Sequence, residues 1–130
     1  MTTQDSLKKG TAAMVVLHLL SRGDRYVYQI SQELAQLSEE RFTLQEGSLY
    51  PTLYRLQEKG DVSDYVMISE KNQRLRKYYS ITDLGRKHLE ELKADFQVII
   101  DGILLIMSAK SESSDIPKPE KQENNPDGQK

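Results

Sequence analysis

Four side chains that can form hydrogen bonds lie close together in the short segment Gly47–Gly60, which reads GSLYPTLYRLQEKG. Leu49, Leu53 and Leu56 recur there at intervals of four and three, the spacing of a helix with one apolar face. Hydroxyl groups and one guanidinium stand around the leucines, and those expected to project from the opposite surface belong to Ser48, Tyr50, Thr52 and Arg55. Hydroxyls both donate and accept hydrogen bonds, and a guanidinium donates two in parallel to a phosphate or a guanine edge. This face is therefore predicted to bind a polar, anionic partner.

The position of a proline indicates where this helix begins. Pro51 has no N–H group to donate to the helical hydrogen-bond ladder, so it is tolerated near the first turn and not in the interior. We therefore expect the helix to begin within one turn of Gly47 and to end at Gly60. The four hydrogen-bonding side chains then project from the surface opposite the leucines. Gly47 lets that end approach a partner closely, and Tyr54 is expected to be partly buried.

A basic segment follows further along the chain. Residues 71 to 87 include six basic residues and one acidic residue, a local charge of +5, although the formal net charge of the chain is −2. This cluster of basic residues creates a local positive field that is not apparent from the net charge of the whole chain. The residues expected to contact nucleic acid here are Lys71, Gln73, Arg74 and Lys77. The alternative is a solvated pair of strands without a ligand, and Arg86 and Lys87 are expected to face water only.

Further helices and strands are predicted around these segments. Residues 7–21 contain the apolar run GTAAMVVLHLLS, which favours a helix buried on more than one face. Residues 26–37 carry an apolar stripe at helical spacing, and residues 42–44 suffice only for a very short strand. Residues 62–69 and 76–82 are rich in Val, Ile, Tyr, Ser and Thr, which favours a β-hairpin with a basic tip.

The last helix is predicted to be long. Thr82 suits its N-cap, and the helix is expected to run from Asp83 to about Met107. Its apolar residues alternate at spacings of three and four, an a/d pattern that requires a second helix to cover it. We therefore expect a homodimer, whose interface would consist of Leu89, Leu92, Phe96, Ile99, Ile103 and Ile106. From Ser108 onward the sequence becomes polar, which favours a disordered tail.

The order of these elements predicts the fold class. Three helices followed by a two-stranded hairpin give a mainly α protein of the winged helix-turn-helix type, here with a long C-terminal dimerisation helix. In that fold the third helix lies in the major groove of double-stranded DNA, and the wing touches the flanking backbone or minor groove. The expected domains are a DNA-binding domain at 1–82, a dimerisation helix at 83–107 and a tail at 108–130. Lys8 and Lys9, ahead of the first helix, are expected to add phosphate contacts.

Composition excludes several other classes of protein. The chain has no cysteine, which excludes disulfides and thiolate metal sites. His18 and His88 have no carboxylate or thiol cluster beside them in the sequence, and no serine comes with a recognisable base and acid, so we expect neither a metal, a cofactor nor an enzyme. No signal peptide is apparent, and no apolar run approaches the ~20 residues needed to span a bilayer. We therefore expect a soluble, cytoplasmic protein that does not bind membranes.

Two motifs resemble those of a known family. The segments EGSLYPTLYRLQEKGDV and RKYYSITDLGRKHL, together with GDRYVYQI, are similar to the PadR family of bacterial transcriptional regulators. The resemblance covers about residues 7 to 107, and the single long C-terminal helix resembles the small subfamily. It implies a dimeric repressor that pairs through its last helix, with help from the first. It also supports Ser48, Tyr50 and Arg55 as DNA-binding residues, together with the basic residues of the wing.

The resemblance further implies control by a ligand. Some small members release DNA when a planar aromatic compound binds beside a large aromatic residue near the dimer axis. Phe96 stands at the matching place, and the expected neighbours are Met14, His18, His88 and Leu92. The alternative is that Phe96 fills the core of the helix seam. The wing departs from the family pattern because Lys71-Asn72-Gln73-Arg74-Leu75 replaces a glycine-containing tip, in which Asn72 is the residue expected to tolerate a positive φ.

Two other functions are compatible with the same sequence. A winged helix can dock a protein partner, in which case the acidic net charge would be the relevant feature and affinity for duplex DNA would be weak. A small-molecule sensor or carrier would instead bind planar aromatics tightly in a manner dependent on Phe96. An enzyme is not among the expected alternatives.

Overall fold

The computed structural model describes residues 3–110 and shows a mainly helical chain with a small antiparallel sheet. The predicted fold class, a winged helix with a long C-terminal helix, is confirmed. The chain divides into two compact units, residues 1–96 and residues 97–130. The predicted domain boundaries remain a prediction, and most of the predicted tail, residues 111–130, lies outside the described residues. The elements are α1 (Thr3–Lys8), α2 (Ala12–Ser21), β1 (Arg25–Tyr26), α3 (Val27–Leu37), α4 (Glu46–Glu58), β2 (Val62–Ile68), β3 (Leu75–Ile81) and α5 (Asp83–Ser108).

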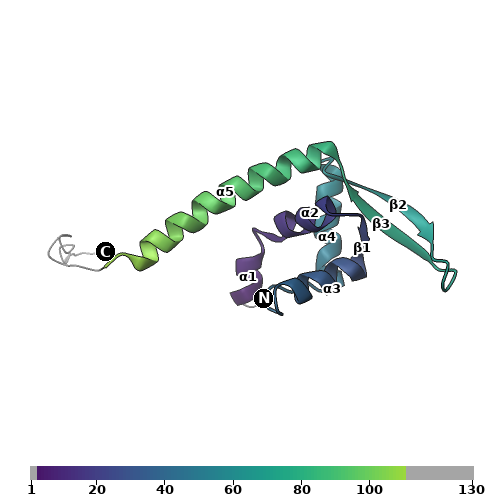
Figure 1. Cartoon of the computed structure of the whole chain (residues 1–130), viewed down its shortest axis with the longest axis horizontal. Helices are drawn as coiled ribbons and strands as arrows, with labels where there is room; N and C mark the ends of the chain where they lie inside the picture. The colour runs from purple at the N-terminus through teal and green to yellow at the C-terminus, as the bar shows by residue number, and fades with distance from the viewer. Residues whose placement is uncertain (1–2, 111–130) are drawn as a thin grey trace, which may run out of the picture. The chain divides into compact units, whose positions relative to one another are not determined.

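The core of the first unit lies between α2, α3 and α4 (Figure 1). The apolar face of each helix turns inward, as the periodicity predicts, and α2 is buried on several sides. Val62, Tyr79 and Leu89 extend the core to the hairpin and to the first turns of α5. The largest fully buried side chains are Leu17, Leu20, Ile30, Leu49, Leu53 and Val16.

The first predicted helix is interrupted. It was expected to run unbroken from residue 7 to residue 21, but α1 ends at Lys8 and α2 begins at Ala12. The N–H and the hydroxyl of Thr11 both donate to the Lys8 carbonyl, at 3.0 and 3.1 Å, which closes a turn in place of a helical register. Gly10, the weakest helix former of the segment, lies within this turn. Lys8 is consequently a helical residue, and only Lys9 lies in the connection.

The sheet contains a strand at a position that was not expected. Residues 42–44 form no strand, and the prediction made for them is wrong. The third strand is instead β1, which pairs with β3 so that Arg25 lies opposite Tyr79 and Tyr26 opposite Tyr78. The strand order is β1-β3-β2, and β2 and β3 form the predicted hairpin.

The hairpin is attached to the turn that precedes β1. The carboxylate of Asp24 accepts hydrogen bonds from the Tyr65 hydroxyl at 2.7 Å and from the Ser80 hydroxyl at 2.8 Å. Tyr65 and Tyr78 lie opposite each other in the register, with ring centroids 5.6 Å apart in a stacked arrangement. Both strands of the wing are thus fixed to the helical part of the unit through one side chain.

The tip of the wing differs from expectation at one residue. Gln73, not Asn72, has the positive φ, 59°. Asn72 instead caps the turn, because its side-chain oxygen accepts a hydrogen bond from the N–H of Arg74 at 3.1 Å.

The start of α5 is held tightly against the end of α4. The Thr82 hydroxyl accepts a hydrogen bond from the N–H of Gly85 at 2.9 Å, which confirms Thr82 as the N-cap. The Thr82 N–H donates to the carbonyl of Asp61 at 2.9 Å. A side chain at Gly85 would collide with that same carbonyl, since a Cβ atom there would lie 2.1 Å from the oxygen. Glycine is therefore required at this crossing.

The predicted seam of α5 has two kinds of residue. Leu89 is 3% exposed and belongs to the core of the first unit, so it is not free to form a dimer interface, and Leu92 packs partly against the same core. In the second unit, by contrast, the helical residues beyond Gln97 carry large exposed apolar side chains. These are Val98, Ile99, Ile103, Leu104, Leu105, Ile106 and Met107.

Candidate nucleic-acid interface

The helix that carries the four hydrogen-bonding residues begins where it was expected. α4 starts at Glu46, one residue before Gly47, and Gln45 precedes it in an extended conformation. Pro51 lies beyond the first turn, as the sixth residue of the helix. The bond that an N–H at this position would donate to the carbonyl of Gly47 is therefore missing, a cost that a proline within the first turn would avoid.

Three of the four side chains are exposed and one is not. Ser48, Tyr50 and Arg55 lie on the exposed surface of α4. Thr52 is only 5% exposed, so the expectation that it projects from this surface is wrong. It lies three residues after Leu49 and four before Leu56, on the edge of the buried stripe. Tyr54 is 62% exposed, which overturns the expectation that it is partly buried.

A pocket of about 340 Å³ lies between the front of α4 and the N-terminal helices. It brings both predicted N-terminal lysines together with three of the four residues of α4. Lys8 is held in place because its ammonium donates to the carbonyl of Thr43 at 2.6 Å and lies 3.8 Å from the carboxylate of Asp5. The pocket is lined by Asp5, Lys8, Lys9, Ala12, Leu44, Ser48, Thr52 and Arg55.

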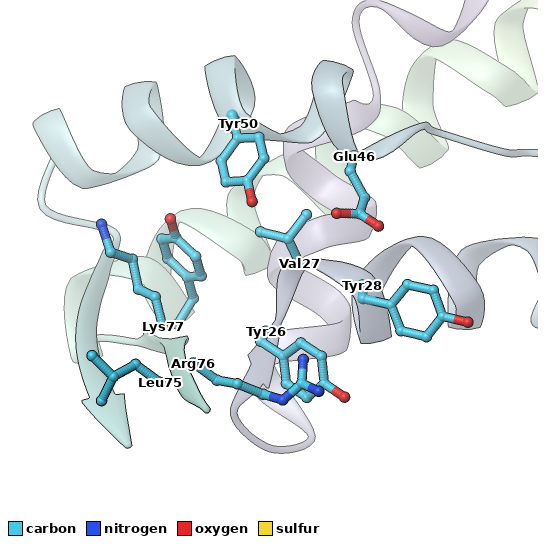
Figure 2. A pocket seen from close by; sticks show the side chains of 9 residues that line it. Tyr26, Val27, Tyr28, Glu46, Tyr50, Leu75, Arg76 and Lys77 are labelled. Carbon is cyan, nitrogen blue, oxygen red and sulfur yellow. The ribbon is translucent and has the colours of Figure 1, made fainter. Parts of the chain in front are cut away.

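A second pocket, of about 200 Å³, separates α4 from the wing. Figure 2 shows Tyr50 and Glu46 pointing into it from α4, and the ammonium of Lys77 reaching from β3 toward the same helix. The guanidinium of Arg76 lies over the ring of Tyr26, 4.4 Å from its centroid, a cation–π contact (Figure 2). The lining residues are Tyr26, Val27, Tyr28, Glu46, Tyr50, Leu75, Arg76, Lys77 and Tyr79.

Several residues of this second pocket were missed by the sequence reasoning. Tyr26, Tyr28 and Arg76 were not expected to take part, although the segment GDRYVYQI places two tyrosines at the beginning of α3. The contacts of Tyr26 with Tyr78 and Arg76 of the wing depend on the pairing of β1 with β3, which no local pattern reveals. Burial raises the pKa of the Tyr79 hydroxyl, and the nearby Asp64 carboxylate raises it further, so this group stays neutral at physiological pH.

The wing carries the remaining predicted residues. Lys71, Gln73 and Arg74 lie exposed in the turn of the hairpin, and Lys77 is exposed with its ammonium 3.6 Å from the carboxylate of Asp64. The hairpin also exposes apolar side chains that the sequence reasoning did not single out. These are Val66, Met67, Ile68 and Leu75.

Of the five residues expected to surround a ligand, two line one pocket together and a third lines another. His88 and Leu92 line a pocket of about 350 Å³ beside Ala13 and Leu56. His18 is exposed and lines a different pocket, of about 250 Å³, with Phe42. Met14 packs against the core, and Phe96 is partly exposed at the end of the first unit.

Among residues 3–110, no group of three or more His, Cys, Asp or Glu side chains could hold a metal ion. None of the helices formed by these residues is long and apolar enough to cross a membrane.

Comparison with known proteins connects these features to a family. Residues 16–91 match the model of the transcriptional regulator PadR-like family. A protein X of Lysinibacillus sphaericus, described as uncharacterised, is 35% identical over 106 residues, which cover 76% of this chain and 90% of that protein. The transcriptional regulator YqjI of Escherichia coli is 28% identical over 94 residues, which cover 72% of this chain and 43% of that protein.

Solved structures agree with this match. A PadR family transcriptional regulator from Eggerthella lenta is 30% identical, with a TM-score of 0.70 over 81% of this chain and 88% of the other. A PadR-like transcriptional regulator from Bacillus cereus is 28% identical, with a TM-score of 0.70 over 81% of this chain and 99% of the other. With more than half of its residues matched to the family, this chain belongs to the PadR-like transcriptional regulators, which are not enzymes.

Proposed function

We propose that this regulator is a homodimeric repressor that binds a near-palindromic operator in double-stranded DNA through α4 and the β2–β3 wing. The observation that supports this most is the exposed face of α4, where Ser48, Tyr50 and Arg55 stand between two pockets lined by basic residues. Phosphate contacts from Lys and Arg supply affinity, and base contacts from a recognition helix supply specificity. We infer that the protein acts in the cytoplasm.

The distribution of charge supports DNA as the partner in spite of the acidic total. The basic side chains Lys8, Lys9 and Arg55 line the pocket on one side of α4, and Arg76 and Lys77 line the pocket on the other. The wing tip adds Lys71 and Arg74, both exposed. Together they would give a duplex positive contacts on both flanks of α4, where the backbone of a bound duplex would pass.

The second unit supports dimerisation. Its helical residues expose Ile99, Ile103 and Ile106 at alternating spacings of four and three, and a contiguous apolar surface of this kind is unusual on a soluble monomer. Pairing of two copies would cover this stripe. Two recognition helices held by such a dimer are expected to meet successive major grooves about 34 Å apart, with half-sites roughly 10 bp apart centre to centre or a multiple of that.

Control by an effector is a further part of the proposal. A planar aromatic compound bound beside Phe96 at the dimer interface would release the operator. The partly exposed ring of Phe96 supports this site, as does the neighbouring pocket lined by His88 and Leu92. Fluorescence titration of planar aromatics against the wild type and Phe96→Ala tests it, because binding should be lost in the variant.

One observation favours a second candidate function, docking of a protein partner. Val66, Ile68 and Leu75 are exposed near the end of the wing, where a DNA-binding surface needs no apolar side chains. In that case the affinity for duplex DNA would stay micromolar or weaker even at low salt.

Binding to the DNA upstream of the protein's own gene tests the main proposal. Fluorescence anisotropy with a labelled duplex should show tight binding that weakens as salt rises. Arg55→Ala should cost about 1–3 kcal/mol of binding free energy if the side chain reads a base. Lys59→Ala, at the exposed C-terminal end of the same helix, serves as the matched control and should change affinity little. Equal affinities of wild type and Arg55→Ala would contradict the assigned recognition surface.

A further inference from the structure

The hydroxyl of Thr52 is buried without a hydrogen-bond partner among the described residues. The residue is 5% exposed, and its side chain makes no hydrogen bond to any of residues 3–110. Buried hydroxyls in proteins are almost always paired, because an unpaired one loses its hydrogen bonds to water without replacement. A buried hydroxyl that no described residue pairs is therefore available to a ligand that reaches it.

The residues around Thr52 indicate which kind of ligand its hydroxyl could bind. Its side chain lines the pocket of about 340 Å³ between α4 and the N-terminal helices, next to the hydroxyl of Ser48 one helical turn earlier. Lys9 and Arg55 line the same pocket, and neither has an ion-pair partner in the part of the chain that the structure describes. The residues that line this cavity therefore include two with hydroxyl groups and two with cationic side chains that have no ion-pair partner among residues 3–110.

The charges in this pocket leave a positive excess. Lys8 and Asp5 also line it, and they form an ion pair with each other at 3.8 Å. Lys8 further donates to the carbonyl of Thr43, which keeps its ammonium at this position. With this pair neutral as a unit, Lys9 and Arg55 give the pocket a charge of about +2. The ligand that matches such a set of donors is a phosphate group, an anion with several acceptor oxygens.

We propose that this pocket is a phosphate-binding site in which the hydroxyls of Thr52 and Ser48 donate to phosphate oxygens and Lys9 and Arg55 neutralise the charge. The phosphate can come from the backbone of bound DNA or from free inorganic phosphate, and the two sources share this chemistry. The DNA source rests on the proposed function and assigns α1 and the turn after it a role in fixing the register of α4 on the duplex. In this case the hydroxyl of Thr52 contacts a phosphate of the DNA backbone inside the pocket.

Two substitutions at Thr52 separate a ligand-binding hydroxyl from a structural one. Thr52→Val keeps the shape and removes the hydroxyl, so thermal stability should be unchanged or higher, because no native hydrogen bond is lost. Affinity for the operator duplex should nevertheless fall by about tenfold or more, the effect of a lost hydrogen bond to a charged group. Thr52→Ser removes a methyl group and keeps the hydroxyl, so it should be less stable while its affinity at a temperature well below unfolding stays near that of the wild type.

The salt dependence supplies a second readout. Lys9→Gln should lower the slope of log affinity against log salt by about one, because one fewer counterion is released. Thr52→Val should leave that slope unchanged while lowering the affinity. Lys93→Gln, an exposed lysine on α5 paired with Glu90, is the matched control and should change neither quantity.

A titration with inorganic phosphate distinguishes the two sources. The amide resonances of Ser48 and Thr52 are followed while phosphate replaces chloride at constant ionic strength, in the wild type and in Thr52→Val. Saturable shifts confined to the wild type support the site for free phosphate, even if the protein binds no operator and the proposed function fails. Loss of operator affinity in Thr52→Val without such shifts supports the DNA backbone as the source. If the wild type binds its operator and Thr52→Val binds equally well, with no phosphate-dependent shifts in the wild type, the inference is overturned while the proposed function stands.

Discussion

Nδ1 of His88 lies 2.6 Å from a carboxylate oxygen of Asp61, and this contact joins the first turns of α5 to the loop that follows α4. Asp61 is 2% exposed, whereas the imidazole is about one-third exposed. The imidazole is the side chain that satisfies this buried carboxylate. Because the carbonyl of the same aspartate accepts from the N–H of Thr82, residue 61 fixes the loop after α4 to α5 through both its backbone and its side chain.

Removal of the imidazole should destabilise the protein. His88→Ala is expected to lower the free energy of unfolding by about 1–3 kcal/mol, since a buried acceptor loses its partner. Urea denaturation followed by circular dichroism measures the change. His18→Ala, which removes an exposed imidazole that makes no hydrogen bond or ion pair among residues 3–110, is the matched control and should stay within about 0.5 kcal/mol of the wild type. Similar losses in the two variants would contradict the role assigned to the pair.

A side chain at Gly85 should be tolerated poorly. In Gly85→Ala the new Cβ would lie 2.1 Å from the carbonyl oxygen of Asp61 and 2.8 Å from Ile81 Cγ1, so the start of α5 must shift. We expect a loss of about 1–3 kcal/mol or more, measured as a fall in Tm. Gly47→Ala on α4 is the control, because nothing lies within 4 Å of a Cβ there and its Tm should be unchanged or higher. An unchanged Tm in Gly85→Ala would show that the crossing of α5 and residue 61 is looser than described.

The hydrogen bond between Tyr65 and Asp24 predicts a loss of stability at alkaline pH. This bond raises the pKa of the Tyr65 hydroxyl above its ordinary value of 10, and desolvation adds to the shift. A raised pKa favours the protonated form in the folded state, so the contribution to stability is present below about pH 10 and is lost as pH rises through the folded-state pKa. Tyr65→Phe should therefore be less stable than the wild type at pH 8, and the difference should shrink toward pH 11.

Urea denaturation at each pH provides this comparison. Tyr54→Phe is the control, because Tyr54 is exposed and its hydroxyl makes no hydrogen bond within residues 3–110. The stability of Tyr54→Phe should parallel that of the wild type throughout the range. A constant difference between Tyr65→Phe and the wild type across the range would exclude the linkage.

The proposed dimer can be broken at the exposed stripe of the second unit. Ile99 and Ile103 are 59% and 45% exposed and lie one helical turn apart. Their joint replacement, Ile99→Asp with Ile103→Asp, should give monomers in sedimentation, because two carboxylates would have to be buried in the seam. Gln97→Asp with Ser108→Asp adds the same charge on the polar side of the helix and should leave the dimer intact. A dimer that persists in the isoleucine variant would place the interface elsewhere.

The elements with strong local patterns were predictable from the sequence. The leucines of α4 and the cap at Thr82 located two helices correctly, because burial of one stripe and satisfaction of free N–H groups are local requirements. The expected exposure of Thr52 was wrong although the information was present. A residue three positions after Leu49 and four before Leu56 lies on the same side of a helix as both.

Other features had no local signal. β1 is two residues long and is a strand only because Tyr26 pairs with Tyr78, 52 positions later. The break at Gly10 depends on the Thr11 hydroxyl, which donates to Lys8 where a helical bond was expected. Of the predicted site, the grouping of Lys9 with Ser48 and Arg55 emerges only from the packing of the N-terminal helices against α4.

The attachment of the wing to Asp24 has a consequence for the order of folding. Within the hairpin, β2 and β3 are near neighbours in the chain and can pair early, whereas the hydrogen bonds of Tyr65 and Ser80 to Asp24 close loops of 41 and 56 residues. We expect the wing to dock on the helices late, after the transition state. A φ-value near zero for Tyr65→Phe would be its kinetic signature, and a value near one would mean that docking nucleates folding. On the ribosome, a chain whose synthesis has just passed α4 would contain the three packed helices before it contains the hairpin that docks beside them.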